Sequence, residues 1–592
     1  MSFKLNPIEF DANGDLTDAQ PSFFSSYYGL SERYKRDLKK GWAGQFRSLI
    51  MPAINEEPYR VLYSSEPSRT NTPVNVCLAS LLLKEMKQVP TDDDIRERLC
   101  FDMEYRYAVC CENYTQAPLS DNVLTNFRQR CIGYYAETGK DLIYDTFIDL
   151  TEVLSQFMEI DKTMISIDST MIAADIKKMN RLDLLYTVNE RLIESIVGVR
   201  VHKKKAKTKT VKEAINIVGG QISIMDIETE QKEVFSECEK NDEKCTKETD
   251  AESKLPESLH RYLDTESKNL TMYHNKEKPY SERIAQVIRD SESLISLCDE
   301  HPEYKETEEY KVFIRVFEEQ CKDDEKGGHI LKGKGDGMDS EIIQSPYDTE
   351  ATFRTKDGKE YRGYEAVFTQ AKNADGETLV LDYECDKNNV SDQELGARMA
   401  NHLEKQDPES GAVLVGDGLF NGETIKAAAH EKNYEIVNTN LTGKKPSEHH
   451  AEHKFDSTGN LLECAGGSVP KSTKLNPDGS CTAKMEKSKC ASCKYREQCS
   501  PVEQKESNSI RVSVQTKERA QEIKERGTDK FKKNCHFRNG VETVPSILKR
   551  KFDVDRIRGA GLAYKKFQIG IDFIALNVDK ALGFMNRRMC YD

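Results

Sequence analysis

Hydrophobic and polar residues follow two different periods along this chain of 592 residues. In the first part, apolar side chains recur every three or four positions, which predicts helices over 74–88, 92–108, 121–135 and 138–157. Further along, apolar and polar residues alternate or form short β-branched runs, which predicts strands over 163–173, 361–370, 378–385, 411–417 and 434–439. Helices are predicted at 391–406 and 422–432, between the last three strands. The pattern indicates a helical N-terminal domain followed by an α/β core.

The order of these elements fits a mixed sheet of the ribonuclease H kind, interrupted by two insertions. A chain of this length is expected to fold into several domains. We predict an N-terminal helical domain (1–157), a first core strand (158–177), a helix-rich acidic insertion (178–335), the continued core (336–445), a cysteine-rich insertion (446–510) and a C-terminal basic part of the core (511–592).

Acidic residues stand at the ends of two predicted strands. Asp168 lies in SIDSTMIAAD and Asp417 in VLVGDGLFNGE, while Glu542 lies in a segment that we predict to be helical. Arg538 and Lys549 flank Glu542 at offsets that return to one face of a helix. Each acid alone is weak evidence, because Asp is common in turns and caps. Together, three carboxylates and two cations are what a two-metal phosphoryl-transfer site needs.

Longer strings around these acids resemble a known family. They include PTDDDIRERLCFDMEYRYAV, LSDNVLTNFRQR, DSTMIAADIKKMNRLDLLY, SPYDTEATFRTKDGKEYRGYEAVF, GDGLFNGE and FRNGVETVPSILKRKFDVDRIRGAGLAYKKFQIGIDFIALN. The chain resembles bacterial insertion-sequence transposases of the DDE type, which have a ribonuclease-H-like core. The nearest group is the eleven-eighty-two insertion-sequence family, related to the insertion-sequence-four group. In the insertion-sequence-four signature a Tyr precedes the Arg, whereas Cys535 stands at that position here, so a role for a phenol does not carry over.

The resemblance implies a DNA transposase that cleaves transposon ends and transfers the strands into target DNA. It implies that Asp168, Asp417 and Glu542 bind two Mg²⁺ or Mn²⁺ ions. The implied partner is double-stranded DNA, both the terminal inverted repeats and the target, on which a homodimer assembles. The residues expected to bind DNA are Arg538, Lys549, Arg550 and Lys551, together with Arg128 and Arg130 from the N-terminal strings.

The distribution of charge makes DNA binding compatible with a net charge of −14. Residues 226–325 hold 29 acidic and 15 basic side chains, which accounts for all of the excess acidity. Residues 502–566 hold 17 basic against 9 acidic side chains, and the run RVHKKKAKTKTVK at 200–212 is a second basic patch. Because binding to phosphates requires Lys and Arg, we predict that the C-terminal patch contacts DNA.

Most of the seventeen cysteines stand singly, as free thiols do in a reducing compartment. Cys490, Cys493 and Cys499 differ, because they form C-x2-C-x5-C, and the C-x2-C spacing lets two thiolates share one Zn²⁺. Cys464, before a Gly-Gly turn, is the expected fourth ligand, since ECAGG resembles the family pattern; Cys481 is the alternative. We predict a structural zinc site, with four free thiols as the competing interpretation.

Other candidate sites are weaker. His449, His450 and His453 have no partners at a matching spacing beside them, so we interpret them as solvated loop histidines. The glycines at 327–328 and 333–337 lack the preceding strand and following helix of a phosphate loop, and are interpreted as a linker.

The remaining features concern location and the competing functions. The apolar run CLASLLL is too short to span a bilayer and the N-terminus lacks a signal peptide, so we expect a cytoplasmic, nucleoid-associated protein with no membrane partner. Two alternatives remain: a ribonuclease-H-like nuclease that cleaves DNA without joining it, and a domesticated DNA-binding regulator. Intact acids argue against the regulator.

Overall fold

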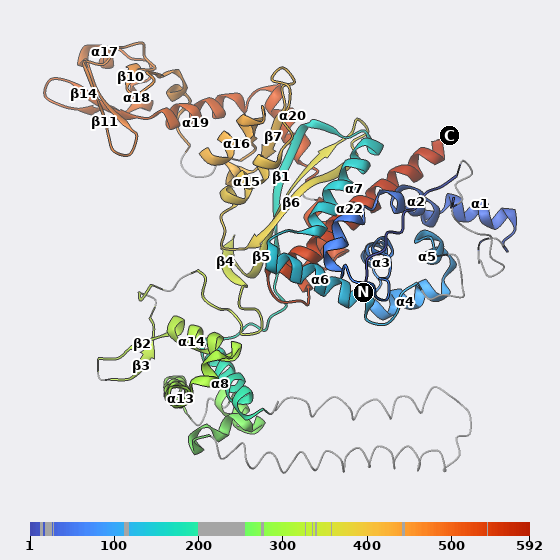
Figure 1. Ribbon diagram of the computed structural model, residues 1–592. Coiled ribbons are helices and arrows are strands. Elements are labelled where there is room, and N and C mark those ends of the chain that lie inside the picture. The colour runs from blue at the N-terminus through green and yellow to red at the C-terminus, as the bar shows by residue number, and fades with distance from the viewer. Residues whose placement is uncertain are drawn as a thin grey trace, which may run out of the picture.

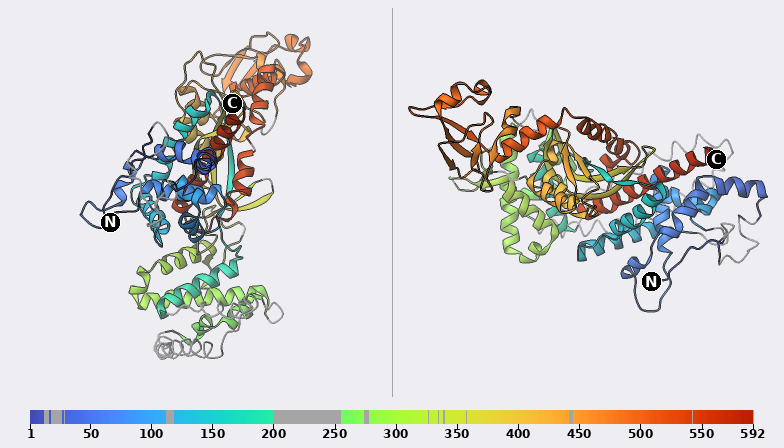
Figure 2. Two further views of the ribbon diagram at one scale, coloured as in Figure 1. Left: turned by 90° about the vertical axis from the view of Figure 1, so that its right-hand side faces the viewer. Right: turned by 90° about the horizontal axis from the view of Figure 1, so that it is seen from above.

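The computed structural model describes residues 1–11, 16–17, 27, 29–111, 118–198, 255–273, 278–325, 327–333, 335–337, 340–356, 358–440, 445–541 and 543–591. The basic run 200–212 and Glu542 lie outside the described residues. Figure 1 shows a central sheet with helices on both faces, a helical lobe at one end and a small module at the other. The left view of Figure 2 also places these two parts at opposite ends. The fold is thus mixed α/β, as predicted.

A mixed sheet forms the centre of the molecule. Its strands are β1 (Asp161–Ala173), β4 (Thr352–Lys356), β5 (Lys359–Lys372), β6 (Thr378–Lys387), β7 (Val413–Gly416) and β8 (Glu435–Asn438). The order is β4-β5-β1-β7-β8, and β6 also pairs with β5. The pairs β4–β5, β5–β6 and β5–β1 are antiparallel, whereas β1–β7 and β7–β8 are parallel. All five predicted strands are confirmed, with small shifts at their ends.

Helices from both ends of the chain cover one face of this sheet (Figure 1). They are α2 (Trp42–Leu49), α3 (Val74–Met86), α6 (Val123–Thr138), α7 (Leu142–Met158) and α22 (Leu562–Tyr591). Nearly all of the apolar residues of α3 are buried, as expected for a helix that is apolar on every side. Residues such as Phe147, Phe368 and Phe573 join the helices and the sheet into one hydrophobic core. The N-terminal helices and the C-terminal helix are therefore stabilised together.

One predicted helix is in fact two. The segment 92–108 forms α4 (Asp92–Phe101) and α5 (Met103–Ala108), because Asp102 is extended and caps α5 by accepting from the Glu104 amide. The predicted cap of α4 is confirmed, since the Thr91 side chain accepts a hydrogen bond from the Asp94 amide.

Two helices, α15 (Asp392–His402) and α16 (Glu423–Glu431), pack on the other face of the sheet. The lobe between β1 and β4 has its own hydrophobic core. It contains α8 (Arg181–Val197), η4 (Glu257–Leu263), α12 (Thr265–Tyr273), α13 (Tyr280–Glu300), η5 (Pro302–Glu306), α14 (Glu308–Gln320), β2 (Cys321–Asp323) and β3 (His329–Leu331). This lobe therefore has a core separate from that of the sheet, although the chain enters it from β1 and leaves it into β4 of the same sheet.

The cysteine-rich module has only a small apolar core. It consists of η7 (Glu448–Glu452), β9 (Lys454–Phe455), β10 (Leu461–Glu463), β11 (Ser472–Leu475), β12 (Cys481–Met485), α17 (Lys487–Ala491), α18 (Arg496–Cys499), β13 (Val502–Glu503) and β14 (Asn508–Val512). The helix α19 (Val514–Glu525) contacts η7 and leads from the module back to the sheet (Figure 1).

The remaining described elements are short. They are α1 (Glu32–Lys40), η1 (Met51–Ala53), η2 (Glu57–Leu62), η6 (Gly418–Phe420), α20 (Asp529–Arg538), α21 (Thr543–Arg550) and η8 (Val554–Arg556).

Candidate active site at the sheet edge

The first two predicted catalytic acids lie side by side. Strands β1 and β7 run parallel, and Ser166 pairs with Val415 at the last matched position. Asp168 and Asp417 each follow two residues later, so the parallel register brings them to the same level. Asp417 directly follows the end of β7, whereas Asp168 lies within β1 and pairs with Phe368 of β5, so the prediction that Asp168 ends its strand is wrong. Asp417 also caps η6, because its Oδ1 accepts a hydrogen bond from the Leu419 amide at 2.8 Å. Asp417 is therefore a helix cap, and the same residue is the candidate metal ligand predicted from the sequence.

Asp168 lies in a mostly buried, partly neutralised environment. Its side chain is 14% exposed, and its Oδ1 accepts from the Ser169 amide at 2.9 Å and lies 3.7 Å from Nη2 of Arg538. Burial raises the pKa of Asp168, and the negative charge of Asp417 adds to this, while the Ser169 amide, Arg538 and Lys356 oppose it.

The prediction that Arg538, Glu542 and Lys549 share one helical face is wrong. Helix α20 ends at Arg538, and Lys549 lies on the separate helix α21, which begins at Thr543. The chain turns between them, where the Val541 amide donates to the Arg538 carbonyl at 2.8 Å. The turn leaves Arg538 at the end of α20, beside Asp168. The position of Glu542 relative to the two aspartates falls outside the described residues.

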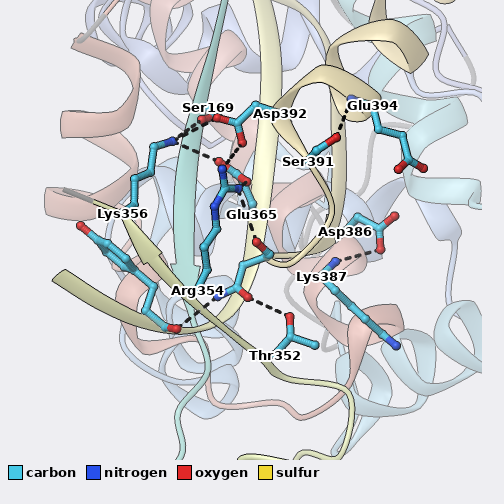
Figure 3. Close-up of polar contacts among 12 residues, drawn as sticks. Ser169, Thr352, Arg354, Lys356, Glu365, Asp386, Lys387, Ser391, Asp392 and Glu394 are labelled. Carbon is cyan, nitrogen blue, oxygen red and sulfur yellow. Dashed lines mark hydrogen bonds and ion pairs between the residues drawn. The ribbon is translucent and has the colours of Figure 1, made fainter. Parts of the chain in front are cut away.

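A charged network that sequence reasoning missed lies next to Asp168 (Figure 3). Lys356 Nζ lies 3.3 Å from Ser169 Oγ, 3.4 Å from Glu365 Oε1 and 3.5 Å from Asp392 Oδ2. Arg354 pairs with the same two carboxylates, and Nη2 lies 2.7 Å from Asp392 Oδ1. Glu365 and Asp392 are buried, and burial followed by the charge of Asp392 raises the pKa of Glu365 to about 7.

Gly363 allows β5 to approach β1 closely beside this network. It has a φ of +138°, and a Cβ there would lie 2.4 Å from the Ile172 carbonyl oxygen. Only glycine fits this position without moving the backbone. The alternation of apolar and polar residues along a strand does not reveal where two strands approach each other closely. The network beside this approach was therefore not predicted from the sequence.

The structure separates the predicted DNA-binding residues into groups. The side chain of Arg128 is 12% exposed and pairs with Asp92 at 3.2 Å, while Arg130 stacks on Tyr63. In the C-terminal patch, Arg550 is exposed, whereas Lys551 pairs with Asp579 at 2.8 Å. Arg538 is the predicted cation that lies at the aspartates.

The four predicted zinc ligands gather in the cysteine-rich module. Cys464, Cys490, Cys493 and Cys499 line one small cavity of about 30 Å³, and His449 and His453 line the same cavity. Burial, followed by the nearness of the other three thiols, raises the pKa of Cys499 to about 11. A Cβ on Gly466 would lie 2.6 Å from Cys493 Sγ and 3.7 Å from Cys464 Sγ, so this glycine makes room for both sulfurs.

Cys481, the alternative fourth ligand, lies elsewhere. It is buried in the small core of the module and is paired with Val512 in the sheet, and its sulfur accepts from the Leu461 amide.

The interpretation of the three histidines as solvated is wrong. His449 and His453 are each only 2% exposed, and His450 is half-buried. They pack against one another because η7 folds onto the cysteine turn and α19. Within the described part of the chain, they are the one group of three or more His, Cys, Asp or Glu whose ligand atoms all lie within 4.8 Å of one another.

Comparison with known proteins gives two matches in separate parts of the chain. Residues 464–582 match the family model of a transposase DDE domain, and residues 38–130 match that of a transposase domain (DUF772). The first match includes the cysteines and Glu542 but begins after Asp168 and Asp417. No curated protein and no solved structure matches. Among the described residues, no helix is long and apolar enough to cross a membrane. Both family matches support a transposase function.

Proposed function

We propose that this protein is a metal-dependent DNA transposase that cleaves transposon ends and joins them to target DNA. The observation that carries the proposal is the pair Asp168 and Asp417, at the same level on two parallel strands with Arg538 at 3.7 Å from Asp168. Two carboxylates and a cation at one sheet edge suit Mg²⁺ and a phosphate group.

The order of elements supports a ribonuclease-H-like core. Three antiparallel strands, β1, β5 and β6, come first, and α15, β7, α16 and β8 follow, with β7 and β8 parallel to β1. In such a sheet, ligands lie beyond the carboxyl ends of the parallel strands, where Asp417 stands at the level of Asp168 in the neighbouring strand. The finer assignment to the eleven-eighty-two family rests on the sequence strings around the acids.

The carboxylates of Asp168 and Asp417 would hold two Mg²⁺ or Mn²⁺ ions, with Glu542 completing the set. When bound there, such ions would supply Lewis-acid activation of a water or 3′-hydroxyl and charge stabilisation of the leaving oxygen. Arg538 would neutralise the phosphate beside Asp168, and Lys549, Arg550 and Lys551 would bind the DNA backbone. The network of Lys356, Glu365 and Asp392 would hold Ser169, and with it the strand that carries Asp168.

The cysteine cavity fits a structural Zn²⁺. The cavity is lined by Cys464 after β10, Cys490 in α17, Cys493 between α17 and α18, and Cys499 at the end of α18, and Gly466 leaves room for two of the sulfurs. The module has few other apolar contacts, so an ion bound by Cys464, Cys490, Cys493 and Cys499 would stabilise it. Such an ion would take no part in phosphoryl transfer.

The deciding experiment separates joining from cleavage. Purified full-length protein is incubated with Mg²⁺, target plasmid and labelled duplexes that carry the DNA flanking the gene on either side. We expect cleaved ends and covalent joint products, which a dimer on the DNA would form in pairs. Cleavage without joint products would favour the nuclease, and binding without cleavage would favour the regulator.

A further inference from the structure

The histidine trio His449, His450 and His453 has the composition and spacing of a metal site. The three residues lie on η7 and directly after it, so that His453 follows His449 by four positions and His450 by three. At these offsets, side chains on a helical turn share one face. Imidazole nitrogen suits Zn²⁺, Co²⁺ and Ni²⁺.

His449 lacks the hydrogen bonds that a buried imidazole needs. It is 2% exposed, and neither Nδ1 nor Nε2 has a hydrogen-bond partner. An unsatisfied buried polar group costs about 1–3 kcal/mol, so an internal partner is expected. One ring nitrogen of His449, one of His450 and one of His453 all lie within 4.8 Å of one another.

His450 and His453 face each other through ring nitrogens. Nδ1 of His450 lies 3.2 Å from Nε2 of His453. Two imidazoles bound to one tetrahedral Zn²⁺ at about 2.0–2.1 Å have nitrogens separated by about 3.3 Å. The observed distance between the two nitrogens is therefore compatible with a bound metal ion as well as with a hydrogen bond between the rings. Burial lowers the pKa of all three histidines, to about 4 for His450 and His453, which keeps the rings neutral, the form that binds metal.

We propose that His449, His450 and His453 bind one divalent transition-metal ion, separate from the ion of the cysteine cage and from those of the carboxylate edge. The ion satisfies His449 and joins two side chains of η7 to His453, the residue that follows it. This proposal is independent of the proposed transposase function, since neither Asp168 nor Asp417 takes part.

Ion binding has a consequence for the neighbouring turn. The Ala465 amide donates to His453 Nδ1 at 2.8 Å, so in the metal-free protein the ring proton is on Nε2 and points to His450. When Nε2 binds the ion, that proton moves to Nδ1, with no net change in the number of protons. The N–H groups of His453 Nδ1 and of the Ala465 backbone then face each other, so the Ala465 amide must turn away. Because Cys464 directly precedes Ala465, this couples the histidine site to Cys464.

The test uses full-length protein, stripped of metal and titrated with Co²⁺ in excess Mg²⁺, which occupies the carboxylate edge. We expect about one Co²⁺ per chain with visible d–d bands and no thiolate-to-cobalt band, beside any thiolate-bound ion. His450→Gln, chosen because His450 is only half-buried, should lose this ion, while His430→Gln, on the exposed end of α16, should keep it. The cysteine variants Cys490→Ser and Cys493→Ser should keep it too.

A second measurement, on wild-type protein, tests the proposal even if a variant fails to fold. In ¹⁵N-labelled wild-type protein, His453 should change from the Nε2–H tautomer in the metal-free state to the Nδ1–H tautomer when diamagnetic Zn²⁺ is added. The proposal is overturned if Co²⁺ binds only with thiolate bands, if the histidine and cysteine variants lose the same ion, or if His453 keeps its Nε2 proton in the presence of Zn²⁺.

Discussion

The sheet edge and the cysteine-rich module place potential metal ligands in opposite surroundings. At the sheet edge, Asp168 and Asp417 lie on a rigid parallel pair of strands inside a large protein core. In the module, cysteines and histidines lie on short turns with a small core of their own. Oxygen ligands on a stable scaffold suit exchangeable ions used in chemistry, whereas sulfur and nitrogen ligands suit a permanent ion that stabilises a weak fold. The comparison predicts that metal removal affects activity at one site and folding at the other.

The largest effect is expected from the acids at the sheet edge. Asp168→Asn, Asp417→Asn and Glu542→Gln should each lower Mg²⁺-dependent cleavage by about 10³-fold or more, because loss of a ligand removes several kcal/mol of charge stabilisation. DNA binding, measured by anisotropy, should stay within about twofold of the wild type. Asp375→Asn, in an exposed turn, is the control. Near-normal cleavage by any one variant would remove that residue from the triad.

The second effect distinguishes folding from chemistry. Cys490→Ser and Cys493→Ser should lose about one zinc per chain and destabilise the module, which limited proteolysis would detect as cleavage within 446–510. Cys100→Ser, a partly buried cysteine of the N-terminal helices, should keep the zinc. A folded, active protein without zinc would show that the thiols are free.

The third effect concerns the basic patch. Reversing Lys549, Arg550 and Lys551 to Glu should weaken DNA binding and flatten its dependence on salt, by about 0.9 in slope for each phosphate group that the variant no longer neutralises. Reversing Lys305, Lys311 and Arg315 in the acidic lobe should change neither quantity. An unchanged slope for the first variant would place the DNA channel elsewhere.

A smaller effect is expected from the network beside Asp168. Glu365→Gln should lower cleavage by about tenfold without weakening DNA binding, because Lys356 loses a charged partner and holds Ser169 less firmly. Lys359→Met, at the exposed tip of the same hairpin, is the control. Since the folded pKa of Glu365 is raised to about 7, wild-type stability should fall as the pH rises from about 4.5 towards 7. The thermal midpoint of Glu365→Gln should fall less over that range.

The smallest effect is on the pH dependence of metal use. Because burial and Asp417 raise the pKa of Asp168, the Mg²⁺ concentration for half-maximal cleavage should increase as the pH falls, starting at a higher pH than for an exposed Asp. Arg538→Ala removes a charge that lowers this pKa, so the increase should begin at a still higher pH. If Arg538→Ala leaves the pH dependence of the Mg²⁺ requirement unchanged, Arg538 does not influence the pKa of Asp168.

The order of elements was predictable because the hydrophobic pattern keeps a regular period over long segments. Alternation in 163–173 and 361–370 gave β1 and β5, and Thr91 followed by acids gave the start of α4. The helix through Arg538 was predicted wrongly, since local spacing cannot show that the chain turns after Arg538. The histidines were predicted wrongly because their burial depends on contacts with α19 and with the turn at Ala465.

By itself, the sequence determined which segments are helix and strand, because this follows largely from local side-chain chemistry. The tertiary structure decided which of them meet. The parallel register of β1 and β7 brings Asp168 to Asp417 across 249 positions of sequence. The close approach at Gly363 lies beside Lys356, Glu365 and Asp392, and the packing of η7 buries three histidines together. Contacts between distant segments depend on the shape of the whole core, and no local period encodes them.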